Sequence, residues 1–174
     1  MDVSRFTNLV FVALIALAVS GALAQERPLL SGADISALPE IEKAGGVFRV
    51  NGQPADEIKI LRDHGCDLFR VRLFLKPDPD FRKTDGATQD LDYVRALGKR
   101  IKSAGGQFLL NLHYSDTWAD PMHQTKPKEW DGLDFDALEA RVAEYTTSVI
   151  KDLQNNGAAP DMVQVGNEIT AGIV

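Results

Sequence analysis

Short apolar segments alternate along this chain with longer segments whose apolar residues recur every three or four positions. The short segments at 68–75, 107–113 and 161–167 are rich in Leu, Phe and Val, a pattern that predicts β-strands. A shorter candidate strand lies at 29–34. The sequence therefore predicts four strands, with the segment at 29–34 as the first.

Helices are predicted between these strands. Pro54 suits the first turn of a helix at 54–64, and Gly65 stops that helix. The next helix ends at the glycine pair 105–106, and one of its faces consists of Leu91, Val94, Leu97 and Ile101. A third helix has a face formed by Phe135, Leu138, Val142, Tyr145 and Val149. Strands and helices that alternate at spacings of about 40 to 55 residues predict right-handed βαβ units and a parallel sheet.

Two architectures share this pattern, an open doubly wound sheet and a (β/α)8 barrel. A doubly wound nucleotide-binding sheet has a glycine-rich turn after its first strand, and neither glycine pair, 45–46 or 105–106, fits that motif. A closed barrel typically needs about 250 residues. With only four strands predicted, such a barrel would be truncated after about the fourth strand.

The first 24 residues have the composition of a secretory signal peptide. Arg5 precedes an apolar run at 6–18, and Ala22-Leu23-Ala24 matches a cleavage site. An uncleaved N-terminal anchor is the alternative. Cleavage leaves 174 − 24 = 150 residues, so we expect one barrel-forming segment at 25–174 that is secreted to the extracellular space or periplasm.

The net charge of −6 gives no basic patch for nucleic acid and no polybasic segment for a membrane surface. The single cysteine, Cys66, has no partner for an internal disulfide, so we expect it to be a small buried hydrophobe. No cofactor and no metal site is expected.

Polar residues stand out near the ends of the predicted strands, where parallel βα folds bind their ligands. Arg70 and Arg72 share one face of the second strand because strand side chains alternate. Asn111 and His113 share a face of the third strand, and Asn167 ends the fourth. Each alone has a structural alternative: an arginine can form a structural ion pair, and a strand histidine can be a core group. Their joint placement favours a site.

The loop at 113–121 is the most specific stretch of the sequence. Trp118 offers an apolar face of the kind on which sugar rings stack, while His113 and Asp116 can hydrogen-bond hydroxyl groups. The alternative is a tryptophan that caps the barrel helices, a role that suits Trp130 better.

Glu168, directly after Asn167, completes the candidate chemistry. A glycosidic bond breaks when one carboxylic acid protonates the leaving oxygen and a second carboxylate attacks the sugar or activates water. Asn167 can bond the sugar 2-hydroxyl, a contact that strengthens in the transition state. The alternative for Glu168 is a helix-start residue that interacts with the helix dipole.

These segments resemble glycoside hydrolase family 53, the arabinogalactan endo-β-1,4-galactanases. The matching runs are Gly32-Ala33-Asp34-Ile35-Ser36, Arg70-Val71-Arg72-Leu73-Phe74, the loop at 113–121 and Val163-Gln164-Val165-Gly166-Asn167-Glu168-Ile169. The resemblance implies a (β/α)8 barrel and retaining hydrolysis of β-1,4-galactan in type I arabinogalactan. It implies Glu168 as general acid/base and substrate contacts from Asp34, Arg70, Arg72, His113, Asp116, Trp118 and Asn167.

Two departures from the family pattern matter. Asn111 stands where an aspartate is expected, which removes one charge from the barrel interior. The family's nucleophilic glutamate belongs to the seventh strand, beyond the strands predicted here, so we expect the 174-residue chain alone to be inactive. Its exposed sheet edges predict self-association. Two alternatives stay open: a non-catalytic galactan-binding fragment, or another retaining barrel hydrolase such as a mannanase or cellulase.

Overall fold

A computed structural model of the chain describes residues 29–77, 79, 86–170 and 172. The signal peptide predicted at 1–24 lies outside the described residues. The described part contains a four-stranded parallel sheet with the strand order β1-β4-β5-β6. The strands are β1 (Gly32–Asp34), β4 (Leu68–Leu73), β5 (Gln107–Leu112) and β6 (Met162–Val165). The predicted order of parallel strands is confirmed, although each strand is shorter than its predicted segment.

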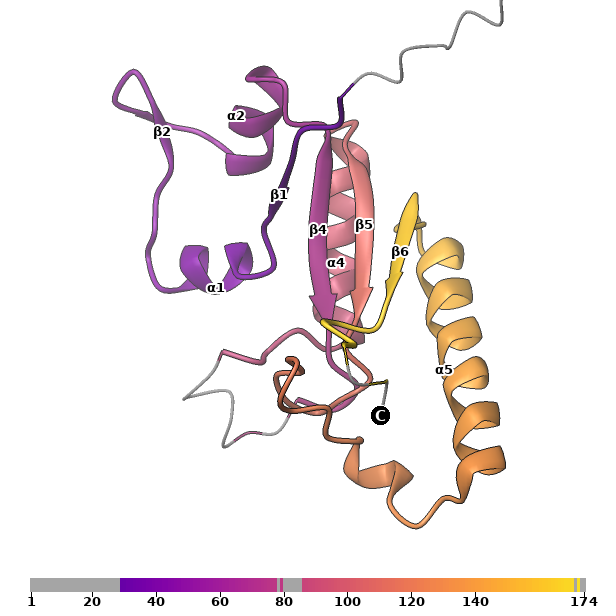
Figure 1. Cartoon of the computed structure of the whole chain (residues 1–174). Helices are drawn as coiled ribbons and strands as arrows, with labels where there is room; N and C mark the ends of the chain where they lie inside the picture. Colours follow the sequence, from indigo (N-terminus) through magenta and orange to yellow (C-terminus); the bar gives the residue numbers. More distant parts are fainter. Residues whose placement is uncertain (1–28, 78, 80–85, 171, 173–174) are drawn as a thin grey trace, which may run out of the picture.

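Two long helices connect the later strands. Helix α4 (Leu91–Ser103) joins β4 to β5 and packs against both strands, and α5 (Phe135–Asn155) joins β5 to β6 (Figure 1). Each helix begins at an aspartate, Asp90 or Asp134, whose side chain accepts a hydrogen bond from a backbone N–H of the first turn. Short elements are α1 (Leu38–Lys43), α2 (Glu57–Asp63) and the 3₁₀ turn η1 (Lys128–Trp130).

The prediction of a helix starting at Pro54 was wrong. Asn51 and Gly52 both have positive φ angles, 51° and 80°, and form the turn of a small antiparallel hairpin. Its strands are β2 (Arg49–Val50) and β3 (Gln53–Pro54), so Pro54 belongs to a strand. Helix α2 begins only at Glu57, after Asp56 has capped it.

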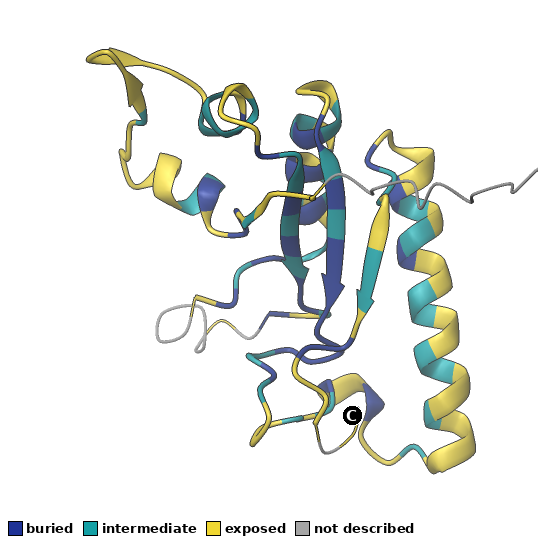
Figure 2. Ribbon diagram, turned by 45° about the horizontal axis from the view of Figure 1, so that its top comes forward, coloured by how far each residue is buried: buried dark blue, intermediate teal, exposed yellow. Residues whose placement is uncertain are grey.

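The two faces of the sheet differ in chemistry because side chains alternate along each strand. On β4, Phe69, Val71 and Leu73 are buried against the helices, whereas Arg70 and Arg72 point to the opposite face. Figure 2 shows the buried residues gathered on β4, β5 and the helix sides that face them. Cys66 is buried, as predicted, and burial raises the pKa of its thiol. The helix-covered face is thus the core, and the polar face remains available for a site.

Candidate active site

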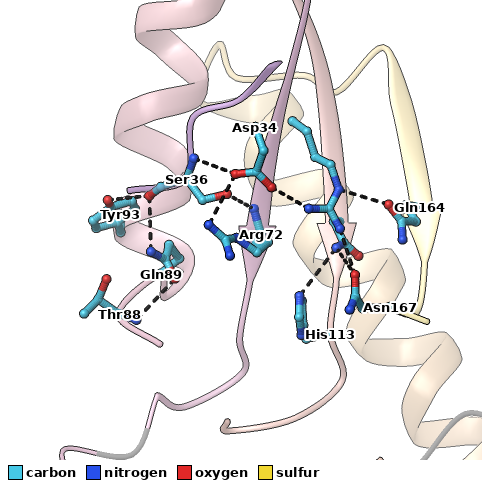
Figure 3. Close-up of polar contacts among 11 residues, drawn as sticks. Asp34, Ser36, Arg72, Thr88, Gln89, Tyr93, His113, Gln164 and Asn167 are labelled. Atoms are coloured by element: carbon cyan, nitrogen blue, oxygen red, sulfur yellow. Dashed lines mark hydrogen bonds and ion pairs between the residues drawn. The ribbon is translucent and has the colours of Figure 1, made fainter. Parts of the chain in front are cut away.

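The polar face brings together side chains from all four parallel strands or the residues after them. In the strand register Asp34 lies opposite Arg70, and Arg72 lies opposite Asn111. Asn167 follows β6 directly after Gly166. Side chains that are far apart in sequence therefore meet at one end of the sheet, as predicted (Figure 3).

Asp34 holds the two arginines of β4. It forms ion pairs with Arg70 and, through Oδ1, with Arg72 Nη2 at 3.3 Å, and it accepts a hydrogen bond from the Ser36 backbone N–H at 3.0 Å. Burial favours the neutral carboxyl, but the hydrogen bonds from Ser36, the charge of Arg72 and the hydrogen bond from Arg70 together lower the pKa of Asp34. Asp34 is thus an ionised partner for both arginines.

Arg70 links three strands through its guanidinium. Besides the ion pair with Asp34, its Nε donates to Gln164 Oε1 at 3.1 Å and its Nη2 donates to Asn167 Oδ1 at 2.8 Å. The planar fork of an arginine suits such divergent contacts. The structural ion-pair alternative considered for Arg70 is therefore present in the molecule, and the same contacts orient Asn167.

The side-chain amide of Asn167 is almost fully used by the protein. Its Oδ1 accepts from Arg70 and from Asn111 Nδ2, the latter at 2.9 Å, which occupies both lone pairs. Its Nδ2 donates to Ala119 O at 2.7 Å. One N–H of Nδ2 remains, so Asn167 can still donate one hydrogen bond to a ligand oxygen.

His113 is buried and neutral. Burial, followed by the positive charges of Arg70 and Arg72, lowers its pKa to about 3. Its Nδ1 accepts a hydrogen bond from the Ala119 backbone N–H at 3.2 Å, and its Nε2 lies 3.4 Å from Asn111 Nδ2. Its ring centroid lies 4.5 Å from that of Phe74. His113 therefore joins the strand end to the following loop, and direct contact with a sugar stays a prediction.

This burial predicts a specific pH dependence of stability. Between about pH 6.5 and the folded pKa of about 3, the unfolded chain binds a proton at His113 and the folded chain does not, so the free energy of unfolding falls as pH is lowered. In a protein that contains the whole barrel, the loss from pH 7 to pH 5 due to His113 should be about 2 kcal/mol. Urea unfolding at both pH values checks this. If the free energy of unfolding of a His113→Gln variant falls between pH 7 and pH 5 by as much as that of the wild type, the prediction is contradicted.

Trp118 stacks on an arginine in the described structure. The Arg72 guanidinium carbon lies 4.6 Å from the centroid of the half-buried indole, and burial lowers the pKa of Arg72 despite the charge of Asp34. Arg72 therefore covers part of one indole face. Trp130, by contrast, is fully buried and packs against Tyr114 and Tyr145 on the helix side, which fits the capping role suggested for it.

The carboxylate of Asp116 accepts hydrogen bonds from backbone N–H groups of two other segments. Its Oδ1 accepts from Lys76 N and its Oδ2 accepts from Lys128 N, each at 2.9 Å, and only 8% of the residue is exposed. The carboxylate thus ties the segment after β4 to the start of η1. Its predicted contact with substrate is not part of this geometry and stays a prediction.

Glu168 is exposed at the end of the same network. It does not begin a helix in the described structure, and its φ angle of 51° lies in the left-handed region that L-residues rarely adopt. Within the described part of the chain, its carboxylate has no hydrogen-bond or ion-pair partner. A carboxylate that is free of the protein, next to a firmly held amide, is available to a ligand.

Several residues of the site were not predicted. The buried Ser36 accepts on Oγ from Arg72 N at 2.9 Å, and its carbonyl oxygen accepts from Tyr93 and Gln89. Gln164 was detectable, because it interrupts an apolar strand segment on the face of Asn111. Within the described residues, no group of three or more His, Cys, Asp or Glu side chains is arranged to hold a metal ion.

Comparison with known proteins identifies the family. The family model of glycosyl hydrolase family 53 matches residues 30–174. The chain belongs to glycosyl hydrolase family 53. A probable arabinogalactan endo-β-1,4-galactanase A of Aspergillus terreus is 44% identical over 144 residues, which cover 82% of this chain and 39% of that protein. The arabinogalactan endo-β-1,4-galactanase of Cellvibrio japonicus is 37% identical over 94% of this chain and 42% of its own length.

A solved family 53 structure agrees with the fold. The catalytic domain from Ignisphaera aggregans superposes with a TM-score of 0.78 at 36% identity, over 83% of this chain and 41% of that domain. The chain thus spans about 40% of the length of the relatives it matches. The predicted fold class, a family 53 (β/α)8 barrel of which this chain covers a part, is confirmed.

Proposed function

We propose that these four strands carry the acid/base half of an endo-β-1,4-galactanase active site, with Glu168 as general acid/base. The observation that carries the proposal is the environment of Asn167. Three hydrogen bonds fix its amide, one N–H remains to donate, and the next residue is an exposed carboxylate without a described partner. An N–H donor for a sugar hydroxyl oxygen, next to a carboxylic acid that can protonate the leaving oxygen, is an arrangement that suits glycosidic cleavage.

The chemistry divides between two carboxyl groups. In the first step Glu168 protonates the leaving glycosidic oxygen while a nucleophilic carboxylate attacks the anomeric carbon. In the second step Glu168 removes a proton from water, which displaces the enzyme carboxylate and restores the original anomeric configuration. The remaining N–H of Asn167 would donate to the sugar 2-hydroxyl oxygen, because both lone pairs of its Oδ1 are occupied. The nucleophile must come from a further strand of the complete barrel.

Substrate contacts are proposed for the residues around this pair. The half-buried Trp118 would present the part of its ring that Arg72 leaves uncovered to a galactose ring. Asp34 and Arg70 would act mainly by holding Arg72 and Asn167 in place, because their polar atoms already bond to these side chains. His113 would hold Ala119, whose carbonyl oxygen accepts from Asn167. The ligand would then be a neutral β-1,4-galactan, the substrate that the names of these relatives indicate for those proteins.

Export is part of the same proposal. A polysaccharide is degraded outside the cytoplasm, and the leader at 1–24 would direct the chain there. None of the described helices is long and apolar enough to cross a bilayer. N-terminal sequencing of the exported protein should give Gln25 as its first residue.

Substrate choice and stereochemistry test the proposed function. The protein that contains the whole barrel should cleave β-1,4-galactan internally and much faster than β-1,4-mannan or cellulose. NMR of the first products should show the β-anomer before it equilibrates, because two displacements retain configuration. Preferential cleavage of mannan or cellulose, inversion of the anomer, or galactan binding without cleavage would each contradict the proposal.

A further inference from the structure

Gln124 connects the loop after β5 to the residue before Glu168. The two N–H groups of its half-buried side-chain amide donate to Asp120 O and to Asn167 O, each at 2.9 Å. The contact with Asp120 closes a turn within the loop, whereas the contact with Asn167 spans 43 positions of sequence. Gln124 therefore transmits the conformation of the loop to the end of β6.

The acceptor in this long-range contact is the carbonyl of the peptide bond that joins Asn167 to Glu168. Fixing this oxygen fixes the peptide plane from which the Glu168 side chain departs. Glu168 leaves that plane with a φ of 51°, a conformation that a glutamate rarely adopts without outside support. Among the described residues, Gln124 supplies the side-chain hydrogen bond to this carbonyl.

The side chain of Asn167 is held independently of Gln124. Its amide bonds to Arg70, Asn111 and the Ala119 carbonyl, and none of these contacts involves Gln124. Loss of the Gln124 amide should therefore leave the Asn167 side chain in place and release only the peptide that carries Glu168. A substitution of Gln124 should therefore affect the proposed general acid Glu168 without affecting the proposed contact of Asn167 with the sugar 2-hydroxyl.

We propose that Gln124 is a positioning residue for Glu168, holding the 167–168 peptide so that the Glu168 carboxylate points at the leaving oxygen. The inference rests on the proposed role of Glu168 as general acid/base. Small displacements of a catalytic group reduce rates strongly, and misplacement by about 1 Å can cost about a hundredfold. The reaction that depends most on proton donation should suffer most.

The test uses Gln124→Met in the protein that contains the whole barrel, because methionine keeps the length but lacks the N–H donors. We measure kcat/KM for galactan, whose leaving group needs protonation, and for an aryl β-galactobioside with an activated leaving group. Galactan hydrolysis should fall about 10- to 100-fold and aryl hydrolysis less than about threefold. The ratio of the two values does not depend on the fraction of folded enzyme, so a purely structural role would leave it unchanged.

Three further variants make the outcome decisive. Gln154→Met, an exposed glutamine on α5, is the matched control and should leave both substrates unaffected. Gln124→Asn has an amide on a side chain too short to reach Asn167 O, so it should change the ratio of the two kcat/KM values in the same direction as Gln124→Met. It replaces Gln124→Met in the test if Gln124→Met does not fold. If Glu168→Gln shows the leaving-group pattern and both Gln124 variants keep the wild-type ratio within twofold, the inference is overturned. If Glu168→Gln lacks the pattern, the proposed function fails first.

Discussion

Replacing Glu168 by Gln in the protein that contains the whole barrel should lower kcat/KM for β-1,4-galactan by about 10²- to 10⁴-fold. Glutamine keeps the size of the side chain but has no acidic proton, so the poor sugar leaving group must depart as an unprotonated oxygen. The exposed position of Glu168 and its lack of a described partner mean that the substitution breaks no internal contact of the described structure. The free energy of unfolding should therefore stay near the wild-type value.

Glu139→Gln provides the matched control. Glu139 is an exposed residue of α5, on the helix side of the sheet, so the same chemical change there should leave the rate of galactan hydrolysis unchanged. Initial rates on galactan, with unfolding curves for both variants, check the expectation. Wild-type activity in Glu168→Gln would remove Glu168 from the mechanism.

Replacing Arg70 by Met should have the largest effect on stability. The change removes one of the two arginine partners of Asp34, the donor to Gln164 Oε1 and one donor to Asn167 Oδ1, at a site where only a quarter of the arginine side chain is exposed. Loss of one cation from a mostly buried charged network weakens the pairing of Asp34 and leaves Gln164 Oε1 without this donor, so we expect a decrease of about 2–3 kcal/mol in the free energy of unfolding.

Arg141→Met is the matched comparison for this experiment. Arg141 pairs with Glu129 and Glu144 at a more exposed position on α5, where ion pairs contribute less than about 1 kcal/mol. Urea unfolding of the two variants at pH 7 measures the difference. Equal losses would show that the Arg70 network is no more than a surface ion pair.

The alternation of strand and helix patterns was sufficient to predict the parallel sheet and the end of the sheet at which the polar side chains meet. The period-two pattern of residues 68–75 placed Arg70 and Arg72 on one face, and the structure confirms that placement. Short elements were missed because few residues define them. The hairpin at Asn51-Gly52 is encoded by a turn of two residues, and Pro54 was equally compatible with a helix start.

Side-chain contacts between distant segments were beyond reach of the sequence. Gln124 lies in a polar loop without periodicity, and its contact with Asn167 arises only when β5 and β6 lie side by side. Asp116 was interpreted as a sugar contact because its motif is polar, yet two backbone N–H groups occupy its carboxylate. The sequence pattern indicates that a polar side chain stands at such a position, but it does not indicate which group that side chain bonds to.

Asn111, which stands where the family resemblance led us to expect an aspartate, has a defined hydrogen-bonding role in the structure. Its Nδ2 donates to Asn167 Oδ1, so an aspartate in the same rotamer would place a carboxylate oxygen against that acceptor. The Oδ1 of Asn111 is buried and has no hydrogen-bond partner among the described residues. The amide therefore helps to orient Asn167 in this chain, at the expense of one unsatisfied acceptor.

The central claim is that Glu168 is the acid/base rather than the nucleophile, and azide tests it most directly. In Glu168→Ala the second displacement lacks a general base, but the azide anion needs no deprotonation and can attack the glycosyl-enzyme in place of water. With an activated aryl β-galactobioside, the account predicts turnover that rises with azide concentration and a β-galactobiosyl azide product, because two displacements retain configuration. An α-galactobiosyl azide would identify Glu168 as the nucleophile, and the absence of any azide adduct would exclude it from acid/base catalysis; either result contradicts the account.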